Sequence, residues 1–209
     1  MRPLVVERTA LLLLDCQNAI VHPDGPIATA MGFAPLVERH GTLAHAAELL
    51  ASFREAGAAV VHVRIAPERA DPDRRAARGH FYALASSGGS SPLATGSWGA
   101  AFHDAVAPLD DELVVGKYPI GAFSRSELDA RLQERGITDL VLAGVATHMV
   151  VESTTRLAAD LGYSVVVAMD AVMANDEATH RASLAVQATF ADVLTNGEIR
   201  SLLTREDRP

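Results

Sequence analysis

The chain has 209 residues, of which 49% are hydrophobic and 21% are charged, so it has the composition of a folded domain and excludes a disordered or fibrous protein. Its formal net charge of −8 argues against a nucleic-acid binder, which needs a basic surface. The single cysteine, Cys16, excludes an intramolecular disulfide and a multi-cysteine metal site. We see no stretch with the length of a signal peptide or a membrane span, and therefore expect a cytoplasmic protein with no membrane partner.

Apolar runs alternate with segments of helical spacing along the chain. The runs predict strands, and the spacing predicts helices between them. The expected strands are 9–14, 58–65, 113–116, 140–143, 164–169 and 191–194, and the expected helices are 34–56, 127–135, 147–161 and 176–190. This alternation predicts one α/β domain over residues 1–209, with a six-stranded, mostly parallel sheet and helices on both faces, a Rossmann-like three-layer sandwich.

Residues 67–99 interrupt this rhythm with a long segment rich in Arg, Asp, Gly and Ser. Loops of this length inside a compact domain are commonly lids or binding loops, so we expect a lid-like loop, with an unstructured insertion as the alternative. Its arginines either meet an anionic substrate or form a solvated face; they are Arg69, Arg74, Arg75 and Arg78. The high apolar content of the chain also predicts burial against another subunit, in a homodimer or homotetramer.

The basic residues are 17 arginines and a single lysine, Lys117. A lysine offers a compact ammonium with a tunable pKa, which arginine does not. Composition alone leaves two interpretations of Lys117 equally open: it has a function, or it is present by chance in a chain that is poor in lysine.

Three features follow directly after predicted strands: Asp15 after the first, Lys117 after the third, and the turn 144–147 after the fourth. In an open parallel sheet, ligands bind outside the carboxyl ends of the strands. A carboxylate beside an ammonium forms an acid–base pair, and amide groups at the start of a helix stabilise a developing oxyanion. Taken singly, the three features also fit a turn carboxylate, a surface charge and an ordinary strand-to-helix connection.

Three stretches resemble the isochorismatase-like hydrolases, which include nicotinamidases, carbamoylsarcosine amidases and isochorismatases. They are LLLLDCQN at 11–18, the segment 116–171 from GKYPIGAF to VVVAMDA, and ATHRASL at 178–184. The resemblance implies the six-stranded fold predicted above and a cis peptide bond between Val145 and Ala146. In the amidase branch it also implies an Asp–Lys–Cys triad, in which Asp15 and Lys117 match the aspartate and the lysine.

The cysteine position of that triad, in a stretch similar to G-V-x-T-x-x-C-V, is occupied here by Val150. Valine cannot act as a nucleophile, so the cysteine-amidase mechanism is excluded. Cys16 is expected to point away from Asp15 and to serve as a buried structural thiol. Two nearby hydroxyls, those of Ser153 and Thr147, have no histidine base that spacing alone identifies.

Isochorismatases also lack this thiol, and like this chain they carry a histidine two residues before the vacant position, here His148. They cleave a vinyl ether, with the aspartate as general acid and water as the nucleophile. By this resemblance Asp15 is the acid and Lys117 its electrostatic partner. The pair Ala146-Thr147 departs from the isochorismatase pattern and looks more like the amidase branch. The alternatives are a member that has lost catalysis and binds a small ligand or partner, and a structural subunit.

The remaining site predictions each have a packing alternative. Gln17 is expected either to orient Asp15 or to form a turn, and Trp98, Phe123 and His148 either to contact a small-molecule substrate or to pack in the core. Ala146 and Thr147 form the expected oxyanion turn. The Asp-x-His metal pair of nicotinamidases is not matched by RIAPER at 64–69, so we expect no catalytic metal and no cofactor.

Overall fold

The computed structural model describes residues 2–69 and 91–205, and within them six strands form one parallel sheet. The strand order is β4-β3-β2-β5-β6-β7, and each neighbouring pair is parallel. This confirms the predicted α/β class. The strands are Thr9–Leu14 (β2), Ala59–Ile65 (β3), Leu113–Lys117 (β4), Asp139–Val145 (β5), Ser164–Met173 (β6) and Asp192–Leu194 (β7).

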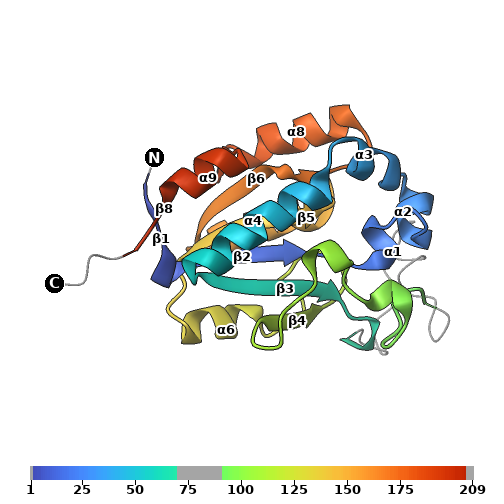
Figure 1. The fold of residues 1–209 in the computed structure, drawn as a ribbon, viewed down its shortest axis with the longest axis horizontal. Helices are drawn as coiled ribbons and strands as arrows, with labels where there is room; N and C mark the ends of the chain where they lie inside the picture. The colour runs from blue at the N-terminus through green and yellow to red at the C-terminus, as the bar shows by residue number, and fades with distance from the viewer. Residues whose placement is uncertain (1, 70–90, 206–209) are drawn as a thin grey trace.

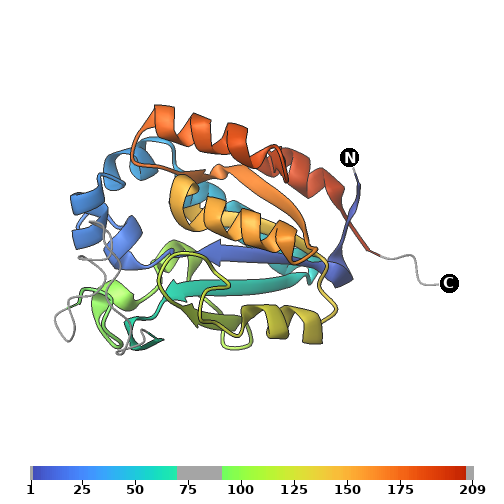
Figure 2. The same ribbon diagram turned by 180° about the vertical axis from the view of Figure 1, so that it is seen from behind.

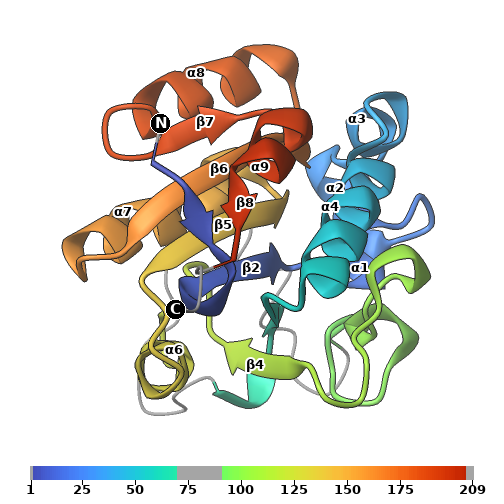
Figure 3. The same cartoon turned by 60° about the vertical axis from the view of Figure 1, so that its left-hand side comes forward.

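Helices cover both faces of this sheet, as Figures 2 and 3 show. Helices α4 (Thr42–Ala56) and α9 (Asn196–Leu202) lie on one face. Helices α6 (Leu128–Glu134), α7 (Glu152–Asp160) and α8 (Glu177–Gln187) lie on the other. The central strand β2 supplies both cores because successive side chains alternate between faces: Leu11 and Leu13 pack toward α4, and Leu12 and Leu14 toward α6 and α7.

Three predicted elements differ clearly from the structure. The helix expected over 34–56 is two helices, α3 (Ala34–Arg39) and α4, because Gly41 between them adopts a left-handed conformation with φ of 60°. The helix expected over 147–161 begins as a π-helical segment, Thr147–Val151 (η6), that leads into α7. Strand β6 also runs four residues beyond the predicted end at Met169, with a register shift against β5.

Short helices that the sequence did not predict lie beyond the carboxyl ends of β2 and β3, to the right in Figure 1. They are α1 (Asn18–Val21), α2 (Pro26–Met31) and the 3₁₀ turns Pro67–Arg69 (η2), Trp98–Ala100 (η4) and Asp104–Val106 (η5). Ile20 and Phe33 form an apolar cluster with Val145 over the strand ends. The lid expected over 67–99 falls largely on residues 70–90, which lie outside the described residues together with Arg74, Arg75 and Arg78.

The two ends of the described chain pair with each other away from the main sheet. Leu4–Val5 (β1) runs parallel to Leu203–Thr204 (β8), and the 3₁₀ turn Val6–Arg8 (η1) connects β1 to β2. No helix between residues 2 and 69 or between 91 and 205 has the length and apolarity to cross a bilayer.

Candidate active site

A buried ion pair joins the ends of two strands that flank β3. Asp15, the first residue after β2, has a left-handed φ of 56°, and Lys117 is the last residue of β4. Lys117 Nζ donates to Asp15 Oδ2 at 2.7 Å, to the Ile120 carbonyl at 2.6 Å and to the Pro119 carbonyl at 3.1 Å. These three acceptors use all three ammonium hydrogens, so Lys117 is held as a fixed cation.

The second oxygen of Asp15, Oδ1, is buried and has no hydrogen-bond partner among the described residues. Burial raises the pKa of Asp15 to about 6, although the charge and hydrogen bond of Lys117 act in the opposite direction. Burial also lowers the pKa of Lys117, against the effect of Asp15. Since Lys117 occupies Oδ2, Oδ1 is the oxygen that is left to take up a proton.

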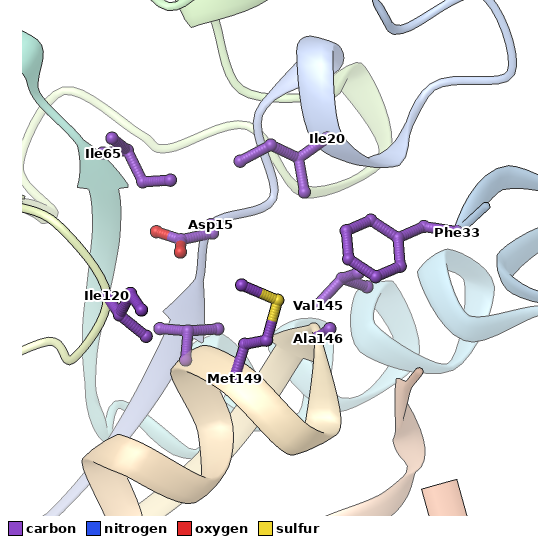
Figure 4. Close-up of a pocket in the computed structure, with 9 residues that line it drawn as sticks. Asp15, Ile20, Phe33, Ile65, Ile120, Val145, Ala146 and Met149 are labelled. Atoms are coloured by element: carbon purple, nitrogen blue, oxygen red, sulfur yellow. The ribbon is translucent and has the colours of Figure 1, made fainter. Parts of the chain in front are cut away.

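Asp15 lies in a pocket that is otherwise lined by apolar side chains (Figure 4). The enclosed cavity is small, about 10 Å³, and the space between the lining atoms reaches about 250 Å³ only when the open mouth is counted. Its lining residues come from the ends of β2, β3 and β5, the loop after β4, and the short helices above them. They are Asp15, Ile20, Phe33, Ile65, Ile120, Val145, Ala146, Met149 and Val150.

The β5 end reaches this pocket through a close contact with β2. Gly144 has a φ of 130°, and a Cβ at this position would lie 2.1 Å from the carbonyl oxygen of Leu14, the residue before Asp15. Only glycine fits here. The next peptide bond, Val145–Ala146, is cis as the resemblance implied, and both of its residues line the pocket.

Thr147, the last residue of the expected oxyanion turn, is held by helix α8 and does not line the pocket. Its hydroxyl is 3.0 Å from His180 Nδ1, and its carbonyl accepts from the Ser183 hydroxyl at 3.2 Å and the Gln187 amide at 3.3 Å. Sequence spacing identified no histidine partner for Thr147, because His180 is 33 residues away. The sequence did hold one pointer to this contact: His180 lies in the stretch ATHRASL, which carries part of the resemblance.

Four residues expected to contact substrate or to orient Asp15 do not line this pocket. Gln17 bridges two segments, since its amide nitrogen donates to the carbonyls of Ile65 and Ala100 and its oxygen accepts from the Ile65 amide. Trp98 is 53% exposed and meets the His22 ring edge-on at 5.0 Å.

The other two pack against neighbouring aromatic rings. Phe123 stacks on Tyr163, with ring centroids 5.9 Å apart, and the His148 ring lies 6.5 Å from that of Phe33. His148 is half-buried, and burial lowers its pKa, so the ring is neutral near pH 7. Phe123 packs against the core, as its packing alternative has it, whereas Trp98 is too exposed for a core residue and Gln17 bridges two segments. A role in substrate contact stays a prediction for all four residues.

Cys16 lies in the core on the α4 side of the sheet, with a side chain that is nearly inaccessible. Burial and the neighbouring Asp15 raise the pKa of its thiol to about 12, so it is not a thiolate at neutral pH. Within residues 2–69 and 91–205, no three side chains among His, Cys, Asp and Glu form a group that could hold a metal ion.

The fold and the site define an α/β protein with a buried acid–lysine pair at the carboxyl edge of a parallel sheet. The sequence model of the isochorismatase domain matches residues 9–198, which is most of the chain. The chain therefore belongs to the isochorismatase family.

Its relatives include proteins named for amide hydrolysis. The chain is 31% identical to the ureidoacrylate amidohydrolase RutB of Azorhizobium caulinodans over 198 residues, covering 88% of this chain and 85% of that protein. It is 30% identical to the maleamate amidohydrolase of Pseudomonas putida, covering 90% and 83%. An uncharacterized isochorismatase family protein of Bacillus subtilis, YddQ, is 32% identical, covering 78% and 76%.

Solved structures show the same fold. A crystal structure from Oleispira antarctica has a TM-score of 0.74 at 31% identity, covering 95% of this chain and 98% of that one. A cysteine hydrolase from Pseudomonas syringae pv. phaseolicola has a TM-score of 0.79 at 24% identity, covering 97% and 95%.

Proposed function

We propose that the protein is a hydrolase of small molecules that acts by direct attack of water, with Asp15 as general acid and base and Lys117 as its fixed electrostatic partner. One observation carries this proposal: the free oxygen of Asp15 is buried in an apolar pocket, with the carboxyl pKa raised to about 6. A group with a pKa near the working pH can both give and take a proton.

Val150 supports the non-covalent route. It is 1% exposed and lines the same pocket as Asp15, at the position where the resemblance places a nucleophilic cysteine. Its isopropyl group has no lone pair to form an acyl-enzyme. Since the thiol of Cys16 is buried on the other side of β2, water is the nucleophile that remains.

The geometry suits general-acid cleavage of an enol ether, the reaction that the resemblance to isochorismatases implies. The proton on Asp15 Oδ1 goes to the enol carbon, and the resulting oxocarbenium ion is stabilised by the carboxylate that is left behind. Water adds to the cation and returns its proton to Oδ1. The hemiketal then breaks down to a carbonyl compound and an alcohol, and Lys117 holds Oδ2 throughout. The same acid and base serve other reactions in which water attacks a polarised carbon.

The direct test follows product release from isochorismate, as pyruvate, and from a neutral enol ether, n-butyl vinyl ether, as acetaldehyde. We expect Asp15→Asn to lower the rate on the active compound by at least about 100-fold, the usual contribution of a positioned acid. Cys16→Ala is the matched control, since it changes the adjacent residue and should retain the wild-type rate. Equal rates for wild type and Asp15→Asn, or loss of activity in Cys16→Ala, would refute the proposal.

The second candidate is a ligand-binding protein that has lost catalysis, and Val150 is the observation that favours it. This reading predicts that a compound bound in the pocket is recovered chemically unchanged from wild type and from Asp15→Asn alike. Turnover by wild type alone decides in favour of the hydrolase.

A further inference from the structure

We infer that the pocket selects an uncharged substrate with a small apolar body, and discriminates against substrates that bear a carboxylate next to the reacting bond. This inference rests on the proposed function, because it concerns the substrate of the same site. The juxtaposition that carries it is a lone, half-satisfied carboxyl group surrounded by eight apolar residues.

The described part of the lining offers no cation to a substrate anion. Lys117 lies behind Asp15, fully buried, with its three hydrogens already donated. Arg69, near the end of β3, is paired with Glu127 at 2.7 Å and is not a lining residue. A buried anion without a partner is strongly disfavoured, so nothing in this wall would offset the loss of hydration of a substrate carboxylate.

Asp15 adds a second penalty for an anionic substrate. When ionised, its free oxygen faces the same small space, where the apolar walls reduce screening. A substrate carboxylate there would be repelled, whereas a neutral amide, ester or ether oxygen would not. The apolar side chains opposite Asp15, including Phe33 and Met149 in Figure 4, instead favour a branched hydrocarbon group.

A pair of ligands with the same shape tests this inference without requiring turnover. Isovaleramide is neutral, and isovalerate is its carboxylate counterpart. We would measure the binding of each to the full chain by titration calorimetry at pH 8. We expect wild type to bind isovaleramide at least tenfold more tightly than isovalerate. Equal or tighter binding of isovalerate, or no binding of isovaleramide, would overturn the inference.

Met149 provides the reciprocal variant, because it lines the pocket and is only half-buried, so a longer polar side chain can be accommodated. We expect Met149→Lys to bind isovalerate at least tenfold more tightly than wild type does. Met149→Gln, which is polar but uncharged, should keep the wild-type preference. A gain for Met149→Gln equal to that for Met149→Lys would show that charge is not what the wall lacks, and would contradict the inference.

These experiments can refute the substrate inference and the hydrolase proposal independently of each other. If wild type prefers the amide but hydrolyses neither test compound of the proposed function, the substrate class stands and the hydrolase proposal fails. If Asp15-dependent hydrolysis is observed but the two ligands bind equally, only the substrate inference is wrong.

Discussion

At the scale of single residues, one proton on Asp15 governs the expected pH dependence. A general acid works in its protonated form, so kcat/KM should fall as the pH rises through the carboxyl pKa of about 6. Lys117 lowers that pKa, so Lys117→Met should move the descending limb to higher pH while circular dichroism confirms that the variant is folded. A pH–rate profile measures both effects. An unshifted limb in the variant would show that Asp15 is not the titrating acid.

Position 150 permits an experiment in which a nucleophile is introduced into the pocket. We expect Val150→Cys to release ammonia from isovaleramide, because the new thiol would share the pocket with Asp15. Val151→Cys is the matched control, since Val151 is equally buried in the same core cluster as Val150 but does not line the pocket. An ammonia assay compares the two. Activity in both variants, or in neither, would mean that position 150 is not placed for attack.

At the scale of secondary structure, the close approach of the paired strands β5 and β2 depends on Gly144. Gly144→Ala forces a Cβ against the Leu14 carbonyl, and we expect it to lower the free energy of unfolding by at least about 3 kcal/mol. Gly136→Ala is the control, because Gly136 also has a positive φ, of 66°, but has open space around it; its cost should be about 1 kcal/mol. Urea denaturation measures both. Equal costs would show that backbone conformation, and not the close approach, determines the effect.

A second link between elements is the carboxylate of Glu112. It accepts hydrogen bonds from Arg54 of α4 at 2.7 and 2.8 Å, from His62 of β3 at 2.9 Å and from the Leu109 amide at 2.9 Å. Burial alone would raise its pKa, but these bonds outweigh burial and lower it from 4.5 to about 2. The folded state therefore gains stability from this group above pH 4.5 and loses it as the pH falls toward 2.

The corresponding variant is Glu112→Gln, which keeps the shape and removes the charge. We expect it to lower the free energy of unfolding at pH 7 by about 2 kcal/mol, the usual contribution of hydrogen bonds to a charged group, and to weaken the acid dependence. Glu134→Gln removes an exposed charge that pairs with Arg131 on the same helix, and should cost less than about 0.5 kcal/mol. Thermal melts from pH 3 to 7 would detect the difference, and parallel curves for Glu112→Gln and wild type would contradict it.

Sequence periodicity could predict the elements whose buried face is encoded by the residue pattern within a single strand or helix. All six sheet strands fall in this group, as do α6 and α8. The break at Gly41 was missed because the apolar residues Leu36 and Leu43 continue the helical spacing on both sides of it. Helices α1 and α2 were missed because their stability comes from packing over the strand ends, through residues such as Ile20 and Ile27, which no local period encodes.

The same distinction holds for the site. Asp15 and Lys117 could be paired from sequence because parallel strands bring their carboxyl ends to one edge. The surroundings of Trp98 and Phe123 could not, since they depend on which way a loop side chain turns, toward His22 in one case and Tyr163 in the other. The contact of His180 with Thr147 joins two helices, and its distance along the chain hides it from spacing arguments.

At the scale of the whole molecule, the expected homodimer or homotetramer remains a prediction. Four large apolar side chains are exposed on the neighbouring helices α7 and α8 and in the segments just after them: Leu157, Leu161, Val186 and Phe190. The double variant Leu161→Glu/Val186→Glu should lower the mass measured by light scattering, and Leu109→Glu, on another exposed apolar residue, should not. A monomeric wild type would contradict the prediction.

The pairing of β1 with β8 brings the first and last strands of the described chain together. Leu4–Val5 and Leu203–Thr204 lie side by side, at the end of the molecule away from the pocket (Figure 1). A short peptide bridge could therefore join these two strands, with new ends opened at the exposed turn of Gly136. Such a circular permutant would retain every residue of the pocket, and a tether to a solid support at β8 would leave the pocket facing the solution.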